Sequence, residues 1–273
     1  MIRPPSIATS PDEEPKSSKG LAGAQTLMRG LDVLSAVADG ARNLPELSEA
    51  LGLTRSTTHR LAATLVEQRF LNFTPRIGYS LGPKLLELGH LAGRQMNLTR
   101  VAHPYLVQLS FETGDTVHLG VLDGGMALYL DKISGTRRIE ISSRIGERQP
   151  LRSTGLGKAM LLDEGETALR DIYARESREW PGYSLDIDTW LDRMRTYRQA
   201  GHAFDLEENE DRIRCIGAPI RDAGSRIIGA ISVTSAAQYM DDDRMATLAR
   251  GVAVTAHAIS AEFGWTGRGS PTP

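Results

Sequence analysis

The stretch LPELSEALGLTRSTTHRLAATL, residues 44–65, constrains the fold more than any other part of the chain. Pro45 suits the first turn of a short helix, and Gly52 supplies the tight turn that follows it. Thr54 is a suitable N-cap for a second helix that ends near Gln68. Two short helices joined by a glycine-containing turn are typical of a helix-turn-helix. The second helix of such a pair either packs in a core only or also enters a groove of DNA.

The segments on either side complete the order of a winged helix-turn-helix. Leucines at helical spacing predict a helix over 26–38, and residues 70–82 read as two short strands around a turn that contains Pro and Gly. Short hydroxyl side chains contact phosphates, and arginine reads guanine edges in the major groove. The candidate DNA-binding residues are Thr54, Arg55, Ser56, Thr57, His59 and Arg60 in the second helix of the pair, and Arg76 at the tip of the hairpin. The alternative reading is a plain three-helix packing unit with a solvated basic face.

Composition narrows the class of protein. The single cysteine, Cys215, excludes a disulfide framework and any zinc site built from cysteines. No apolar run approaches the length of a membrane span, and the first 20 residues lack the apolar core of a signal peptide. Residues 1–100 hold 12 Lys and Arg against 9 Asp and Glu, whereas the remainder holds 20 against 25. We therefore expect a cytoplasmic protein without cofactor or metal, with a weakly basic front and an acidic back.

The rest of the chain mixes helical and strand patterns. Predicted helices cover 83–97, a short stretch that ends at 111, 156–162, 167–174, 188–200 and 241–263. Predicted strands cover 116–122, 126–133, 138–146, 213–220 and 226–234. Strands that form one sheet, with helices at both ends of the segment, indicate an α+β domain.

Six stretches occur in a characteristic order: RGLDVLSAV, LSEALGLTRSTTHRLAATL, YSLGPKLLELG, GDTVHLGVLDGGMALYLDKI, SRIGERQPLRSTGLGKAMLL, and GHAFDLEENEDRIRCIGAPIRD followed by IGAISVTS. In this order they resemble the IclR family of bacterial transcription regulators, over residues 26–263. The resemblance implies a winged helix-turn-helix, a helical linker and a GAF-like effector domain, in a dimer or tetramer. SRIGERQPLRSTGLGKA and TVHLG look most like the branch that includes the 2-keto-3-deoxygluconate regulators of sugar-acid catabolism.

Together the patterns and the resemblance predict an α+β chain of five parts. These are a disordered tail at 1–20, a winged helix-turn-helix at 21–82, a linker helix at 83–98, a GAF-like effector domain at 99–264 and a flexible tail at 265–273. Two positions depart from the family pattern. Arg212 stands where Gly usually precedes the (I/V)RC motif, and Phe70 occupies the place of a common Gly at the start of the wing. The first departure bears on effector specificity and the second on how the chain enters the wing.

The stretch PLRSTGLGKAMLL predicts a binding site for a small anion. Ser153 or Thr154 can cap the helix that follows. The free N–H groups of Gly155 and Leu156 would then face an anion at the positive end of the helix. A keto-acid or sugar acid is the corresponding effector. The alternative reading is that Ser153 and Thr154 only cap the helix.

The resemblance adds further effector-binding residues from the second half of the chain. The positions that match the family's pocket are Asp205, Ile213, Cys215, Ser232 and Thr234. Strand alternation places Ser232 and Thr234 on one face of their strand. His118, in the stretch TVHLG, is an additional candidate. As alternatives, Cys215 is a small buried apolar residue and His118 a core or surface histidine.

The leading prediction is a DNA-binding regulator, more often a repressor, of an operon for sugar-acid or related small-carboxylate catabolism. Its expected partners are double-stranded operator DNA, a small carboxylate effector, and further copies of the chain in a homodimer or homotetramer. One rival hypothesis is a hydrolase with Cys215 as nucleophile and His118 as base. Another is a small-molecule sensor that acts through protein contacts and does not bind DNA.

Overall fold

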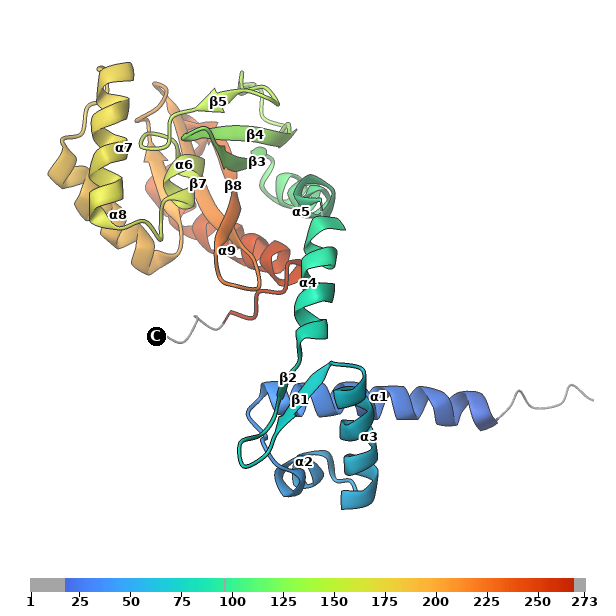
Figure 1. Cartoon of the computed structure of the whole chain (residues 1–273). Helices are drawn as coiled ribbons and strands as arrows, with labels where there is room; N and C mark the ends of the chain where they lie inside the picture. Colours follow the sequence, from blue (N-terminus) through green and yellow to red (C-terminus); the bar gives the residue numbers. More distant parts are fainter. Residues whose placement is uncertain (1–17, 96, 268–273) are drawn as a thin grey trace, which may run out of the picture. The chain divides into compact units, whose positions relative to one another are not determined.

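The computed structural model describes residues 18–95 and 97–267, which form two compact units (Figure 1). Unit 1 comprises residues 1–95 and unit 2 residues 96–273. Within the described residues, no helix combines the length and the apolar character needed to cross a membrane.

Unit 1 contains three helices, a hairpin and a fourth helix. In chain order these are α1 (Ser18–Ala38), α2 (Leu44–Leu51), α3 (Arg55–Glu67), β1 (Leu71–Thr74), β2 (Gly78–Leu81) and α4 (Pro83–Gln95). Val33, Leu47 and Leu71 are buried where the three helices and the hairpin meet. The predicted order is confirmed, but α1 begins at residue 18 instead of 26. Residues 18–20 are therefore helical, where a disordered tail was predicted, and the earlier part of that tail lies outside the described residues.

Local capping explains where α2 begins and ends. Asn43 is the N-cap, and its side chain accepts a hydrogen bond from the Glu46 amide at 3.0 Å. Glu46 in turn accepts one from the Arg42 amide at 2.7 Å, so two otherwise unpaired donors are satisfied. Gly52 ends the helix in the left-handed conformation with φ of 60°, which glycine adopts without strain. The turn predicted from sequence is confirmed.

The hairpin is tied to the connection between α1 and α2. The Tyr79 amide donates to the Arg42 carbonyl at 2.7 Å. A Cβ on Gly78 would lie 2.0 Å from the same carbonyl oxygen, so this close approach requires glycine.

The left-handed residue at the entry to the wing is Arg69, with φ of 62°, and not Phe70. The Phe70 amide donates to the Leu65 carbonyl at 2.9 Å, which closes the C-terminus of α3 around Arg69. The position that favours glycine is therefore 69, one residue before the one predicted. Arg212 also has a φ of 62°, which gives a physical reason for the glycine that the family pattern has there.

Unit 2 is a six-stranded antiparallel sheet with helices on both faces. Its elements are α5 (Leu98–Thr113), β3 (Thr116–Asp123), β4 (Met126–Ile133), β5 (Arg148–Gln149), α6 (Gly155–Met160), α7 (Glu166–Glu179), α8 (Ile187–Ala200), β6 (Ala203–Leu206), β7 (Ile213–Arg221), β8 (Ile227–Ala236), a 3-10 turn (Ala237–Tyr239) and α9 (Asp242–Glu262). The strand order is β5-β4-β3-β8-β7-β6. With unit 1, this confirms the predicted α+β fold class.

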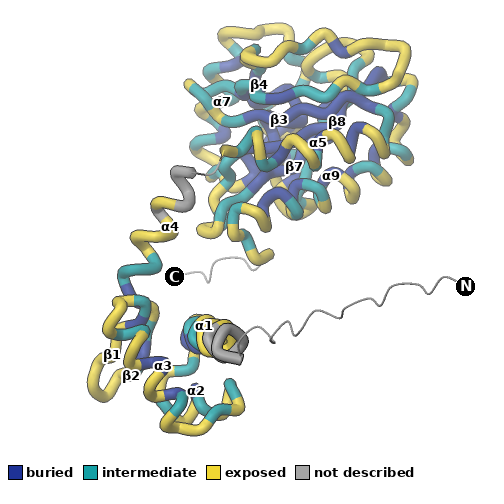
Figure 2. Tube along the Cα trace, turned by 90° about the vertical axis from the view of Figure 1, so that its right-hand side faces the viewer, coloured by how far each residue is buried: buried dark blue, intermediate teal, exposed yellow. Residues whose placement is uncertain are grey.

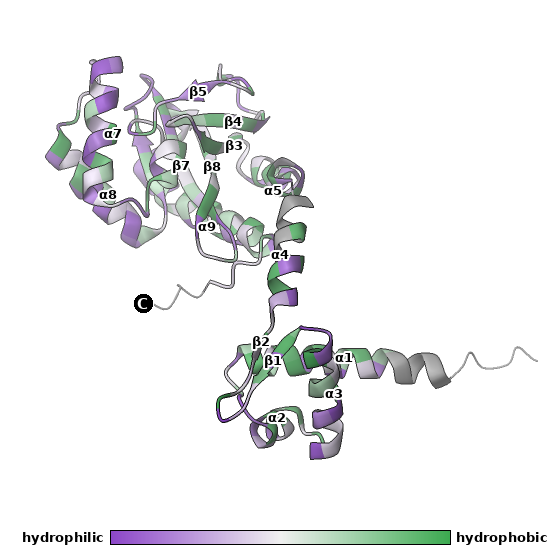
Figure 3. Ribbon diagram, in the orientation of Figure 1, coloured by the Kyte–Doolittle hydropathy of each residue, from purple (hydrophilic) through white to green (hydrophobic). Residues whose placement is uncertain are grey.

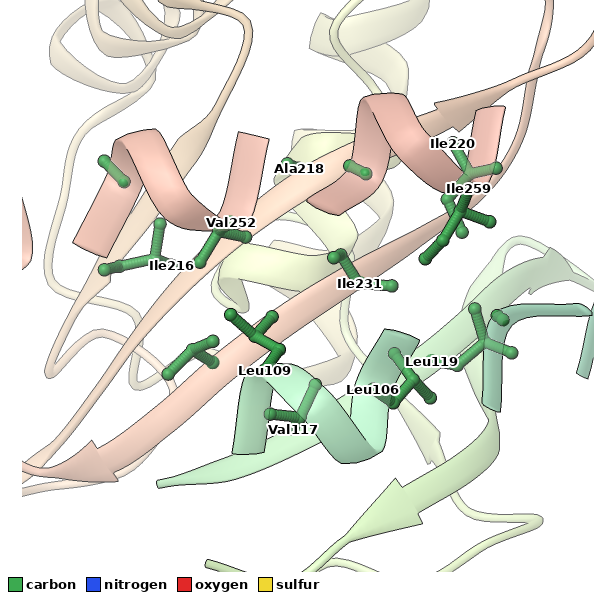
Figure 4. Close-up of a cluster of buried hydrophobic side chains, with 14 of the residues drawn as sticks. Leu106, Leu109, Val117, Leu119, Ile216, Ala218, Ile220, Ile231, Val252 and Ile259 are labelled. Atoms are coloured by element: carbon green, nitrogen blue, oxygen red, sulfur yellow. The ribbon is translucent and has the colours of Figure 1, made fainter. Parts of the chain in front are cut away.

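One face of the sheet packs against α5 and α9, and α6 packs on the opposite face, with α7 and α8 beyond it (Figure 1). Strand alternation sorts the side chains, so that Ile216, Ala218 and Ile220 of β7 face α9 (Figure 4). Figure 2 shows β3, β7 and β8 as the buried centre of the unit. Cys215 and Gly217, which alternate with these isoleucine and alanine residues along β7, face α6.

Three predicted elements differ from the structure. Residues 138–146 form a loop where a strand was predicted, because the Lys132 ammonium group binds the carbonyls of Ile141 and Ser143 in place of a neighbouring strand. Strands β5 and β6 were not predicted, and α7 continues to Glu179, beyond the predicted end at residue 174. The linker helix α4 ends at Gln95, and α5 begins at Leu98 behind the N-cap Asn97.

The expected C-terminal tail does not begin at residue 265. The Trp265 ring packs against His257 with 4.8 Å between centroids, and its amide donates to the Ser260 carbonyl at 3.1 Å. Residues 268–273 of that tail lie outside the described residues.

Candidate DNA-binding and effector-binding sites

The N-terminus of α3 is built from short hydroxyl side chains. Thr54 is its N-cap, and the Thr54 Oγ1 accepts a hydrogen bond from the Thr57 amide at 3.4 Å. The Thr54 hydroxyl also lies 3.0 Å from the Thr57 hydroxyl and 3.2 Å from that of Ser56. Thr58 points inward and is fully buried. The cap predicted from sequence is confirmed, and the hydroxyls of this turn form one connected group at the surface.

Basic side chains are exposed on α3 and in the hairpin turn. Arg55, His59 and Arg60 are exposed on α3, and Arg76 is exposed in the turn between β1 and β2. Among the described residues, none forms an ion pair or hydrogen bond with the guanidinium groups of these arginines. Arg69, in contrast, pairs with a glutamate of α4. Free guanidinium groups beside a helix N-terminus suit phosphate and base contacts.

The α6 face of the sheet holds a cavity of about 300 Å³. Six of the predicted effector-binding residues line it: His118, Thr154, Asp205, Ile213, Cys215 and Thr234. Strand register brings several of them together, because Asp205 pairs with Cys215 and Cys215 with Thr234 across β6, β7 and β8. Residues far apart in the sequence therefore form one wall.

Four predicted residues do not line this cavity. Ser153 lies beside it and donates a hydrogen bond to the Asn209 side chain at 2.8 Å. Gly155 packs against Cys215, where a Cβ would come within 2.9 Å of the sulfur atom. Leu156 is fully buried in the core, and the buried Ser232 hydroxyl has no hydrogen-bond partner among the described residues.

Helix α6 is anchored to the sheet by its first turn. The Thr154 hydroxyl donates to the Pro150 carbonyl at 2.7 Å and accepts from the Gly157 amide at 3.0 Å. A Cβ on Gly217 of β7 would lie 2.2 Å from the Gly155 carbonyl oxygen. Thr154 therefore caps α6, and it also lines the cavity.

His118 forms part of the cavity wall as a neutral imidazole. Its ring stacks on Tyr129 at 4.8 Å between centroids, and its Nε2 lies 2.6 Å from the Ser143 hydroxyl. A β-bulge between β3 and β4 places both Tyr129 and Lys132 on the same face as His118. Burial, with a smaller contribution from the nearby Lys132 charge, lowers the pKa of His118 to about 3, so the ring is uncharged at neutral pH.

Burial also favours the neutral forms of Asp205 and Cys215, which line the same wall. Burial raises the pKa of Asp205 to about 7, against the opposing effect of the Lys158 charge. Burial, with the Asp205 charge, raises the pKa of the Cys215 thiol to about 11. A thiol in this state is a poor nucleophile at neutral pH, which argues against the hydrolase hypothesis.

A buried ion network fixes the loop after β6. The Lys158 ammonium group binds the Glu208 carboxylate and the Phe204 carbonyl, the latter at 2.8 Å. Arg193 binds the same carboxylate at 2.9 Å, and the Tyr183 hydroxyl donates to it at 2.6 Å. The network holds in place the loop whose amides bind Asp205.

The sequence did not predict the other ten residues that line the cavity. These residues are Tyr129, Ile141, Ser142, Ser143, Glu147, Gln149, Pro150, Trp180, Asn209 and Glu210. Most belong to loops, and no periodic pattern marks them. Residues 141–143 fall in the segment that was read as a strand. Within the described residues, no group of three His, Cys, Asp or Glu side chains is placed to hold a metal ion.

The fold and the two sites define a class of protein, a transcription regulator with a DNA-binding unit and a ligand-binding unit. Family models match both units: the IclR helix-turn-helix domain over residues 26–75, and the C-terminal domain of bacterial IclR transcriptional regulators over residues 90–261. The chain belongs to the IclR family. It is a DNA-binding transcriptional regulator with operator DNA and a small-molecule effector as partners, and it is not an enzyme.

Relatives align over most of the chain. The HTH-type transcriptional regulator XynR of Escherichia coli is 31% identical over 246 residues, which cover 88% of this chain and 98% of that protein. The regulator KdgR of the same species is 31% identical over 230 residues, 81% of this chain and 86% of that protein. The acetate operon repressor of Salmonella typhimurium is 29% identical over 249 residues, 89% and 91% of the two chains.

A solved structure shows the same fold. The crystal structure of Pseudomonas aeruginosa HmgR has a TM-score of 0.77 at 21% identity and covers 89% of this chain and 100% of that one.

Proposed function

We propose that the protein is a repressor that releases its operator in response to a small carboxylate, such as a sugar acid whose catabolic operon it controls. DNA binding is supported by three arginines whose guanidinium groups are exposed and unpaired. They are Arg55 and Arg60 on α3 and Arg76 in the wing. The name of the Salmonella relative, acetate operon repressor, supports repression by analogy. The stretches SRIGERQPLRSTGLGKA and TVHLG, which resemble the 2-keto-3-deoxygluconate regulators, support the sugar-acid branch.

The mechanism is differential affinity. An effector in the unit 2 cavity favours one arrangement of the chain over another, and only one arrangement spaces two recognition helices correctly for an operator. The protein acts in the cytoplasm, where chromosomal DNA is accessible.

Two copies of the chain are required for a palindromic operator, and unit 1 carries apolar surface suited to pairing. Leu27 and Leu31 are exposed one helical turn apart on α1, and Leu86 and Leu91 are exposed on α4. Figure 3 shows hydrophobic stretches along both helices. Large apolar side chains gathered on exposed helices favour association. We infer a homodimer, which can pair again to a homotetramer.

A footprint on DNA upstream of the protein's own gene tests this function. Wild-type protein should protect a site with two half-sites about one helical turn, or a multiple of it, apart. Arg55→Ala and Arg60→Ala should weaken protection without changing effector affinity, whereas Arg250→Ala, on exposed surface of α9, should leave it intact. Normal protection by both α3 variants would remove α3 from the groove.

A further inference from the structure

The cavity wall carries acidic side chains and no basic ones. Asp205, Glu147 and Glu210 line it, and no Lys or Arg is among its lining residues. An anion that enters such a site meets like charges, which is unfavourable in a partly buried setting. Building on the proposed function, we propose that the effector binds as an acid together with one proton, which it shares with Asp205 in a carboxylic acid–carboxylate hydrogen bond.

The geometry of Asp205 leaves one oxygen atom for a ligand. Its Oδ1 accepts hydrogen bonds from the amides of Glu208 at 2.8 Å and Asn209 at 3.3 Å. Its Oδ2 accepts none from any described residue, although the side chain is only 3% exposed. The two amides fix the orientation of the carboxyl group, and Asp205 lines the cavity.

The charged and titratable groups around Asp205 come from five elements. They are Lys158 of α6, Glu208 of the following loop, Cys215 of β7, Tyr129 of β4 and Tyr197 of α8. Only Lys158 is cationic, and its ammonium group is engaged by Glu208 and a backbone carbonyl. Lys132, the cation nearest His118, is engaged by two loop carbonyls. Among the described residues, no Lys or Arg lines the cavity, and both of these lysines are already engaged, so neither is free to pair with the ligand.

A proton can neutralise one of the two negative charges that meet when the ligand carboxylate lies beside Asp205. Because burial already raises the pKa of Asp205 to about 7, the carboxyl group is partly protonated at neutral pH. A second carboxylate beside it raises that pKa further, since two adjacent like charges resist joint ionisation. The neutral His118 cannot provide the charge instead. Above about pH 7, binding should take up close to one proton, and affinity should fall toward tenfold per pH unit.

Three probes with the same hydroxylated carbon chain test the proposal: D-gluconate, D-sorbitol and D-glucamine, which are anionic, neutral and cationic. Binding to the full-length protein is measured by isothermal titration at about pH 8 in two buffers of different ionisation enthalpy. We expect gluconate to bind with uptake of close to one proton and sorbitol with none. Gluconate binding without proton uptake overturns the proposal, as does tighter binding of sorbitol or glucamine, or the failure of all three probes to bind.

A variant identifies the proton acceptor. Asp205→Asn keeps an Oδ1 for the two amides and should bind gluconate without proton uptake and with little change between about pH 7 and pH 8.5. Asp171→Asn, on exposed surface of α7, should behave like wild type. Unchanged uptake in Asp205→Asn rejects Asp205 as the acceptor. Operator binding, measured on the same proteins without ligand, separates the two proposals, because its absence contradicts the proposed function and not the proton uptake.

Discussion

His118 and Asp205 should give unit 2 opposite dependences of stability on pH. Asp205 has a folded pKa of about 7, above its ordinary 3.8, so its stabilisation is present below that ordinary value and is lost as pH rises through about 7. His118 has a folded pKa of about 3, below its ordinary 6.5, so its stabilisation is present above 6.5 and is lost as pH falls toward 3. Between these limits the two effects oppose each other.

The magnitude follows from linkage. Each group changes the free energy of unfolding by about 1.4 kcal/mol per pH unit within its window, with opposite signs. From about pH 5 to about pH 6.5 the pair should nearly cancel in wild type. In Asp205→Asn only the His118 contribution remains, so the free energy of unfolding should rise by about 2 kcal/mol from the lower to the higher pH. His118→Gln should expose the Asp205 effect, a loss of about 2 kcal/mol.

Urea unfolding followed by tryptophan fluorescence measures both variants. All three tryptophans, Trp180, Trp190 and Trp265, lie in unit 2, so the signal reports that unit alone. The difference between each variant and wild type removes the contributions of other titrating groups. Slopes in both variants equal to that of wild type would refute the reasoning that burial sets these two pKa values.

Three further predictions concern the α3 cap, the packing of α6 against β7 and the DNA interface. Thr54→Ala removes the α3 cap and should cost unit 1 about 1 kcal/mol in a denaturant titration; an unchanged midpoint contradicts the capping role. Gly217→Ala places a Cβ against the Gly155 carbonyl and should destabilise unit 2 by about 3 kcal/mol, whereas Gly182→Ala, with open space around it, should not. Arg60→Ala should lower the salt dependence of operator binding, with a slope smaller by about 1 in log–log form; an unchanged slope excludes a phosphate contact.

Elements with local signals could be predicted from the sequence. Gly52 ends α2 in the left-handed conformation, and Thr54 begins α3 as its N-cap, as their residue types suggested. Alternation in β8 placed Ser232 and Thr234 on one face, which the strand register confirms. These features depend on residues that are neighbours in sequence.

Features set by tertiary contacts could not be predicted in this way. Residues 141–143 form a loop in which the carbonyls of Ile141 and Ser143 accept hydrogen bonds from the Lys132 side chain and not from a neighbouring strand. The pKa of Asp205 is raised because the folded chain buries its carboxyl group. Gly155 and Leu156 offered amides for an anion, but packing against β7 places them outside the cavity wall. The acidic character of that wall appears only when loops from distant segments meet.

The most direct test of the account is fluorescence anisotropy of the protein on DNA from upstream of its own gene, with and without 2-keto-3-deoxygluconate and related sugar acids. We predict specific, salt-dependent binding that one of these acids weakens. Specific binding that no acid alters would contradict the sugar-acid effector, and the absence of specific binding at low salt would contradict the assignment of α3 to the DNA groove.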